Sequence, residues 1–194
     1  RSPAGGVTKF SYDDDDRLTA KIEPRGNVAG ATPSDYDWLY TYDAAGNQRT
    51  AADPLGNVTT TNFDANDNKV SVTDANSRST LFVFDQENQL VAVTGPDAPT
   101  CSTGTECVNG KASTVYEYDD AGKVTRRVDP KGHLTTSVYD LSERLVETTS
   151  ALAKKWTYGY DADGNQTTQV TPKGQTRSYR EEVLADSPAA YWRL

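Results

Sequence analysis

Aromatic and polar side chains alternate along several short segments of the chain. The alternation is clearest at 36–42, 80–84 and 156–160, where rings or Thr fall at every second position. Residues two apart lie on one face of an extended strand, so the pattern predicts strands that each carry a stripe of rings. The segments at 69–73 and 90–94, KVSVT and LVAVT, are short and rich in Val and Thr, which is also typical of strands.

An aromatic residue followed by Asp recurs along the chain at a fixed spacing. The pairs are Tyr12-Asp13, Tyr42-Asp43, Phe63-Asp64, Phe84-Asp85, Tyr118-Asp119, Tyr139-Asp140 and Tyr160-Asp161. The step is 21 residues from 42 to 63 to 84, and again from 118 to 139 to 160. The two longer steps contain turn-rich stretches, which we interpret as loop insertions near 27–35 and 96–110.

Two turn signals recur within each unit. In the first, Asp accepts backbone N–H groups and a later residue adopts the left-handed conformation, for which Gly46, Gly122 and Gly164 are suited. The second lies twelve residues after the aromatic and reads EPRG, DPLG, GPDA, DPKG or TPKG, or DANS and SALA where Pro is lost. Each unit is therefore two strands and two turns. The predicted fold class is all-β, with tandem 21-residue β-hairpins in an elongated twisted sheet or in part of a spiral β-shell or barrel.

The aromatic stripes allow two interpretations. Rings of neighbouring units are expected to form ladders across the sheet, because no single unit buries its aromatic face. On an open sheet, exposed rings could instead stack on sugars, and the candidate ligand-stacking residues are Trp38, Tyr40, Trp156 and Tyr158. Packing in register favours the first interpretation, and the second stays open.

The stretches YDAAGNQRTAADPLGNVTTTNFD and YDDAGKVTRRVDPKGHLTTSVYDLSERL resemble the RHS or YD-repeat family. The resemblance runs from about Tyr12 to Tyr179. It implies a ribbon of hairpins that spirals into a shell, which encloses a toxin in bacterial toxin systems and belongs to an adhesion receptor in animal teneurins. Seven units are too few to close a large shell, so we expect a piece of a longer array. The family's self-cleaving core is not visible, and no catalytic residue is carried over.

The net charge and the two cysteines restrict the expected partners and location of the protein. The net charge is -8 and Lys and Arg do not cluster, so we expect no nucleic-acid partner. No apolar run reaches the roughly 18 residues of a membrane span. Cys101 and Cys107, with five residues between them in a polar loop, predict a disulfide and an oxidising, extracellular location, secreted or at the cell surface. A metal pair is the alternative, but partner ligands are lacking.

Three features raise the question of metal binding or catalysis. The segment DADGN at 161–165 resembles a calcium loop, but it shares its register with the other aspartate turns and lacks the later Glu. The run Asp13–Asp16 is interpreted as a solvated turn, with a cation site as the alternative. His133 has no second histidine or free cysteine to act with. We therefore expect no enzyme, cofactor or metal.

Residues 1–180 are predicted to form the array, and residues 181–194 break its pattern. The last segment, EEVLADSPAAYWRL, resembles the start of a laminin-G-like, concanavalin-type jelly-roll domain, with a linker as the alternative. We expect a non-enzymatic scaffold or shell that encloses or presents another part of a large protein, such as a polymorphic toxin. Its partners are other repeats or domains of that protein and a toxin cargo. The alternative is an adhesion module that binds a glycan or a protein, or that self-assembles through open strand edges.

Overall fold

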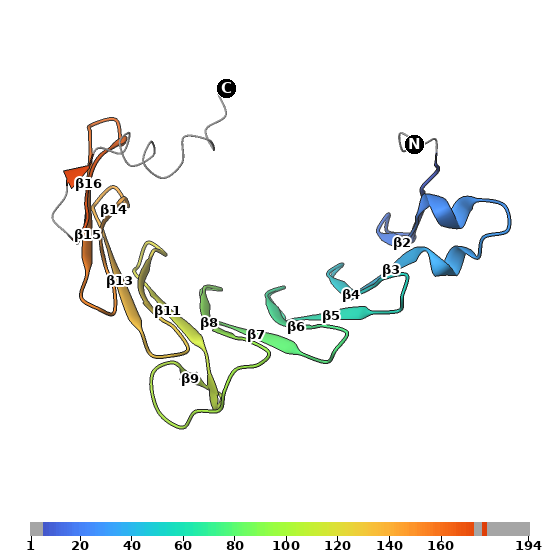
Figure 1. The fold of residues 1–194 in the computed structure, drawn as a ribbon, viewed down its shortest axis with the longest axis horizontal. Coiled ribbons are helices and arrows are strands. Elements are labelled where there is room, and N and C mark those ends of the chain that lie inside the picture. The colour runs from blue at the N-terminus through green and yellow to red at the C-terminus, as the bar shows by residue number, and fades with distance from the viewer. Residues whose placement is uncertain (1–5, 173–175, 178–194) are drawn as a thin grey trace. The chain divides into compact units, whose positions relative to one another are not determined.

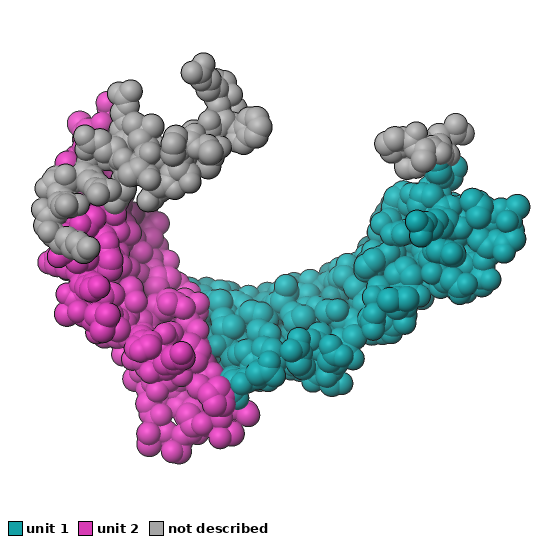
Figure 2. All heavy atoms as spheres, viewed as in Figure 1, with its two compact units in different colours: residues 1–98 teal, residues 99–194 magenta. Residues whose placement is uncertain are grey.

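The structure is a computed structural model that describes residues 6–172 and 176–177. The chain divides into two compact units, Arg1–Ala98 and Pro99–Leu194 (Figure 2). The predicted linker or jelly-roll segment at 181–194 lies outside the described residues.

Unit 1 is an antiparallel meander in which each strand pairs with the next strand along the chain (Figure 1). Its described strands are β1 (Lys9–Tyr12), β2 (Leu18–Ile22), β3 (Asp37–Tyr42), β4 (Gln48–Ala52), β5 (Val58–Phe63), β6 (Lys69–Thr73), β7 (Ser79–Phe84) and β8 (Leu90–Thr94). Two short 3-10 helices, η1 (Pro24–Asn27) and η2 (Pro33–Asp35), lie in the connection between β2 and β3.

Unit 2 repeats this arrangement. Its main strands are β11 (Thr114–Tyr118), β12 (Val124–Val128), β13 (Leu134–Tyr139), β14 (Leu145–Thr149), β15 (Lys155–Tyr160), β16 (Gln166–Val170) and β17 (Thr176–Arg177). A separate small hairpin, β9 (Cys107–Val108) and β10 (Lys111–Ala112), lies in the connection before β11. Both units confirm the predicted all-β fold class of tandem hairpins.

The aromatic residue at the end of each hairpin's first strand marks a change of register. In the β3–β4 hairpin, Thr41 pairs with Thr50, but Tyr42 pairs with Gln48. The same one-residue shift occurs at the equivalent position of every described hairpin that carries the aromatic-aspartate pair. An extra residue in one strand is a β-bulge, which increases the local twist and sets the register of the hairpin.

The sheet of each unit is a single layer with a very small core. Among the described residues, the buried apolar side chains are Ala92, Ala112 and Val128, and the buried polar ones are Thr94 and Ser113. The rings on β3, β7 and β15 are half-buried.

The expected ladders of adjacent rings are not found in the described pairings. Tyr40 lies opposite Ala51, Phe82 opposite Val93, and Tyr158 opposite Gln169. Each 21-residue repeat contributes two strands, so one strand lies between the aromatic strands of consecutive repeats. The rings of consecutive repeats are therefore about 10 Å apart. This spacing is too wide for direct stacking of most rings.

Candidate functional site

The aspartate turn is the element that recurs through both units, and Asp43 shows its geometry. The Asp43 N–H donates to the Asn47 carbonyl (2.9 Å), and the Gly46 N–H donates to the Asp43 carbonyl (3.1 Å). The Asp43 Oδ1 atom accepts the N–H groups of Ala45 (3.0 Å) and Asn47 (2.9 Å). One carboxylate oxygen therefore satisfies two backbone donors that a three-residue hairpin loop would otherwise leave to water.

The same four hydrogen bonds form at ten aspartates of the described chain. These are Asp13, Asp43, Asp53, Asp64, Asp74, Asp85, Asp119, Asp129, Asp140 and Asp161. Ser150 begins an eleventh turn that keeps only the two backbone bonds among those the structure describes.

In three repeats the second turn is thus also an aspartate turn. The sequence analysis identified it by Pro, but Asp53, Asp74 and Asp129 hold it, and Pro54 and Pro130 occupy only its first corner. Pro24 and Pro96 also occupy the first corner of a turn, as expected, but no aspartate side chain holds these two turns among the described hydrogen bonds. Pro24 begins η1, and Pro96 lies in a turn closed by the Ala98 N–H on the Gly95 carbonyl (3.2 Å).

The fourth residue of every turn adopts the left-handed conformation. Gly fills this position five times, as Gly46, Gly56, Gly122, Gly132 and Gly164. Six other residues adopt a positive φ there, namely Asp16, Asp67, Ser77, Asn88, Glu143 and Ala153. For a non-glycine residue this conformation costs roughly 1–2 kcal/mol.

The fifth residue of the turn binds the second oxygen of the carboxylate. Its side chain donates to Asp Oδ2 in the pairs Arg17–Asp13, Asn47–Asp43, Asn57–Asp53, Asn68–Asp64, Arg78–Asp74, Arg144–Asp140 and Asn165–Asp161. His133 Nδ1 lies 2.9 Å from Asp129 Oδ2 in the same way. This fifth position is not among the site residues predicted from the sequence. Its signal was available, because the fifth residue is Arg, Asn, Gln, Lys or His in every copy.

These donors favour the charged form of the carboxylates. The backbone N–H of His133, followed by its side chain, lowers the pKa of Asp129 to about 2 despite some desolvation. The side chain and N–H of Arg144 likewise lower the pKa of Asp140. The carboxylates of Asp129 and Asp140 are therefore ionised at neutral pH and already accept hydrogen bonds from protein donors. In the part of the chain that the structure describes, no group of three or more metal-ligating side chains forms a metal site, Asp13–Asp16 and 161–165 included.

Contacts between consecutive hairpins form at the turns that follow the aromatic-aspartate pairs. We call the turns 13–17, 43–47, 64–68 and 85–89 of unit 1, and 119–123, 140–144 and 161–165 of unit 2, the aromatic rim. The Tyr42 hydroxyl donates to the Leu18 carbonyl (2.8 Å), Tyr139 to Val124 (3.2 Å), and Tyr160 to Leu145 (2.7 Å). Each acceptor directly follows the preceding turn of the rim.

Side chains of neighbouring turns on this rim also meet. The fifth residue of one turn binds the fourth of the next in three places: Asn47 to Asp67 (2.6 Å), Asn68 to Asn88 (2.8 Å), and Lys123 to Glu143 (3.0 Å). Two fifth-position arginines lie over the next hairpin's tyrosine, with Arg17 5.2 Å from the Tyr42 ring centre and Arg144 4.8 Å from that of Tyr160. The contacts of Asp67, Asn88 and Glu143 offset part of the cost of their left-handed conformation.

The candidate ligand-stacking residues lie in both units. Trp38 and Tyr40 are on β3, and the Trp38 Nε1 donates to the Glu23 carboxylate (3.3 Å). Trp156 and Tyr158 are on β15. Trp156 lines a surface hollow of about 420 Å³ with Lys154, Thr171 and Pro172. The four side chains are all half-buried, so a part of each ring faces solvent.

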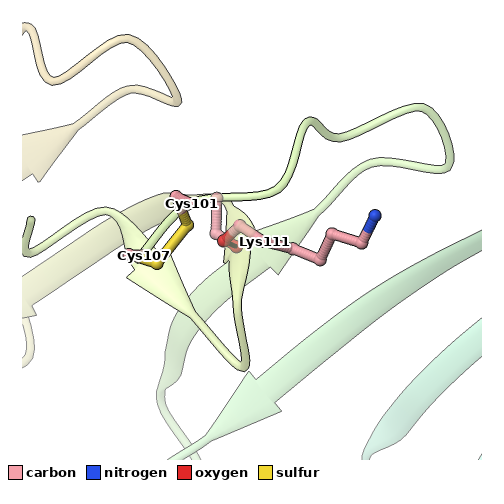
Figure 3. Close-up of a disulfide and its surroundings, with 4 residues drawn as sticks. Cys101, Cys107 and Lys111 are labelled. Atoms are coloured by element: carbon pink, nitrogen blue, oxygen red, sulfur yellow. Dashed lines mark hydrogen bonds between the residues drawn. A yellow bond between two sulfur atoms is a disulfide. The ribbon is translucent and has the colours of Figure 1, made fainter. Parts of the chain in front are cut away.

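The predicted disulfide is present in the insertion of unit 2 (Figure 3). Cys101 and Cys107 are bonded, with their Cα atoms 5.7 Å apart, so neither is available as a metal thiolate. The Cys101 N–H donates to the Gly110 carbonyl (3.1 Å), and the Ser113 N–H donates to the Glu106 carbonyl (2.7 Å). The bond therefore joins the start of the insertion to β9 and fixes its fold at the base of β11.

Comparison with protein families gives one match. Residues 118–154 and 139–176 match the family model described as RHS Repeat. This part of the chain is similar to RHS repeats. No curated protein matches the chain. No helix in the described residues is long and apolar enough to span a membrane.

Solved structures of similar fold include two Tc toxin assemblies. The crystal structure of TcdB2-TccC3 aligns with a TM-score of 0.55 at 15% identity over 86% of this chain and 11% of that chain. The Photorhabdus luminescens Tc holotoxin pore, with a mutated TccC3, aligns with a TM-score of 0.54 at 10% identity, again over 86% of this chain and 11% of that chain. The likeness shows a shared fold, and this chain spans about a tenth of either protein.

Proposed function

We propose that the chain is a non-enzymatic wall segment of a larger secreted or surface protein, and that its hairpins help to enclose or present another domain. The observation that carries the proposal is the aromatic rim, where tyrosines and turn side chains bind each hairpin to the next. Hairpins joined in this way extend a sheet one repeat at a time, as in other repeat proteins. The RHS Repeat match and the fold shared with Tc toxin assemblies support the same role.

The chemistry of the described residues also favours a wall over a catalyst. The turn carboxylates already accept hydrogen bonds from backbone N–H groups and from fifth-position side chains. Asp129 is the one described hydrogen-bond partner of the His133 side chain. The disulfide Cys101–Cys107 supports an oxidising, extracellular setting.

Protease protection in the full-length parent protein tests the proposal. We expect the enclosed domain to resist trypsin while the wall is intact, and to be digested when Tyr139→Ala and Tyr160→Ala remove two ties between hairpins. The matched control is Leu141→Ser, because Leu141 is a fully exposed rim residue. An intact protein in which the neighbouring domain is digested as fast as the isolated domain would contradict an enclosing role.

A second candidate function, glycan binding, is favoured by the hollow beside Trp156. An indole face next to a proline ring and a lysine suits a sugar with an anionic substituent. A glycan array compares the wild-type chain with Trp156→Ala and Trp38→Ala. Loss of signal with unchanged folding supports binding, and signals that do not depend on either indole argue against it.

A further inference from the structure

We propose that Asn57 is an attachment site for an N-linked glycan. Asn57, Val58 and Thr59 form the motif Asn-x-Thr, in which the middle residue is not Pro. This motif marks the acceptor asparagine of N-glycosylation in secreted proteins. The proposal goes beyond the wall function and shares with it only the extracellular setting that the disulfide supports.

The motif lies at the surface, where an aspartate turn leads into β5. Asn57 is the fifth residue of the turn 53–57, and all three residues of the motif are exposed. Leu55 at the tip of the turn is 86% exposed. A Cβ atom on Gly56 would have no heavy atom beyond its chain neighbours within 4 Å. The structure therefore leaves room beside Asn57 for a bulky substituent.

One amide hydrogen of Asn57 is not used in the described contacts. The Asn57 Nδ2 donates to Asp53 Oδ2 (2.8 Å), which is its one described bond. The Asn47 Nδ2 instead donates both to its own turn and to Asp67 of the next turn (2.6 Å), and Asn68 makes the same two kinds of bond. A sugar replaces one amide hydrogen. At Asn57 the turn keeps a donor for Asp53, whereas at Asn47 or Asn68 one of two bonds is lost.

A second copy of the motif, at 165–167, differs in its position. Asn165 is the fifth residue of a turn on the aromatic rim, which is the position at which Asn47 and Asn68 bind the next turn. A substituent there would compete with such a contact. Asn57 lies on the opposite rim and binds its own turn alone among the described residues. We therefore assign the glycan to Asn57.

Attachment is a group transfer from a lipid-linked donor. The Asn57 Nδ2 atom forms a bond to C1 of an oligosaccharide carried on a polyprenyl pyrophosphate, and the bond between C1 and the pyrophosphate oxygen breaks. The pyrophosphate leaves with the electron pair of that bond, and a base of the transferase takes the proton that Nδ2 loses. The hydroxyl of Thr59 is the part of the motif that the transferase recognises. The product is a solubilising group beside the exposed Leu55 side chain.

Mass spectrometry of the secreted parent protein from its native source tests the assignment. Trypsin releases residues 50–69 as one peptide, in which Asn57 alone begins the motif. We expect this peptide to carry a glycan that fragmentation places on Asn57. An unmodified peptide, or a glycan confined to Asn165, overturns the proposal.

Variants of the 194-residue chain, secreted by a host whose transferase accepts the motif, test the chemistry. Asn57→Gln and Thr59→Ala should each abolish modification of the peptide 50–69. Thr59→Ser keeps the hydroxyl and should restore it, and the matched control Thr60→Ala lies outside the motif and should leave it unchanged. A modification that persists in Thr59→Ala would not be N-glycosylation and would overturn the assignment.

Urea denaturation tests the structural basis, with Asn165→Gln in every chain. The wild-type sequence and a variant that moves the motif to Asn47, Arg49→Thr with Asn57→Gln, are each compared with and without the sugar, trimmed to its first residue. We expect the midpoint to be unchanged by a sugar on Asn57 and lowered by one on Asn47. Equal losses would overturn the argument from the amide hydrogens. An unmodified Asn57 would leave the enclosing role untouched, and a failed protease-protection experiment would leave the glycan assignment untouched.

Discussion

Within each unit, the two rims of the sheet use the same aspartate turn but tolerate change differently. On the aromatic rim, every described turn has five residues and no insertion. On the opposite rim, unit 1 has the turns 53–57 and 74–78 and the long connection 23–36, and unit 2 has the turns 129–133 and 150–154 and the long stretch 99–113 that leads into β11. The difference follows from what each turn contacts. A turn bound to its neighbours through a tyrosine and a fifth-position side chain cannot lengthen without breaking those contacts.

The largest effect is expected from lengthening one turn on each rim of unit 2. Insertion of Gly-Ser into the turn 140–144 should break the four bonds of Asp140, the Tyr160–Leu145 bond and the Arg144–Tyr160 contact, at a cost of about 2–4 kcal/mol. The same insertion in 150–154 should cost about 1 kcal/mol or less, because loop closure alone adds little. Urea denaturation measures both. Equal losses would show that the two rims are equivalent.

An insertion on the opposite rim has its own tight packing, which one glycine tests. A Cβ atom on Gly26 would lie 2.8 Å from the Tyr36 Cβ and 2.9 Å from the Ile22 Cγ2. Gly26→Ala should therefore cost about 1–3 kcal/mol through overpacking. Gly95→Ala is the matched control, because no heavy atom lies within 4 Å of the added methyl group. Similar unfolding midpoints for both variants would mean that the insertion simply shifts to accept the methyl.

How much of this could be read from the sequence depends on the range of the contacts involved. The hairpins, their ends and the left-handed Gly positions follow from a period of two and from turn chemistry, which are local. The Tyr42–Leu18 bond spans 24 residues, and Asn27 binds the Val7 carbonyl 20 residues away (3.0 Å). Such contacts depend on which strands become neighbours. The predicted ladders of rings are wrong for the same reason, because a second strand lies between the aromatic strands of consecutive repeats.

The tyrosine ties can be tested one atom at a time. Tyr160→Phe removes the hydroxyl that donates to the Leu145 carbonyl (2.7 Å) and should cost about 0.5–1.5 kcal/mol. Tyr158→Phe is the control from the same strand and face, since no hydrogen bond of its hydroxyl is found among the described residues. Urea denaturation of both variants makes the comparison. Phe63 and Phe84 already fill the equivalent position in unit 1, so a large loss would imply that Tyr160 does more than bind one carbonyl.

The smallest expected effect is the contribution of a single carboxylate to the loss of folding stability at low pH. The pKa of Asp129 is lowered to about 2 in the folded chain, below the usual value for an aspartate. Folding is therefore favoured by the ionised form, so this contribution is complete above the unfolded pKa and is lost as the pH falls toward the folded one. Wild-type stability should drop between about pH 5 and about pH 2. Asp129→Asn should be less stable at neutral pH and lose less on acidification.

Two comparisons decide whether the turn geometry causes this response. Asp14→Asn changes an exposed carboxylate of the turn 13–17 and is the control for the loss of one negative charge. Asp140→Asn should flatten the profile as Asp129→Asn does, because the turns on both rims bind Oδ1 in the same way. A response to Asp129→Asn alone would assign the acid sensitivity to the His133 partner. In that case the shared aspartate turn would not explain the stability of the array in acid.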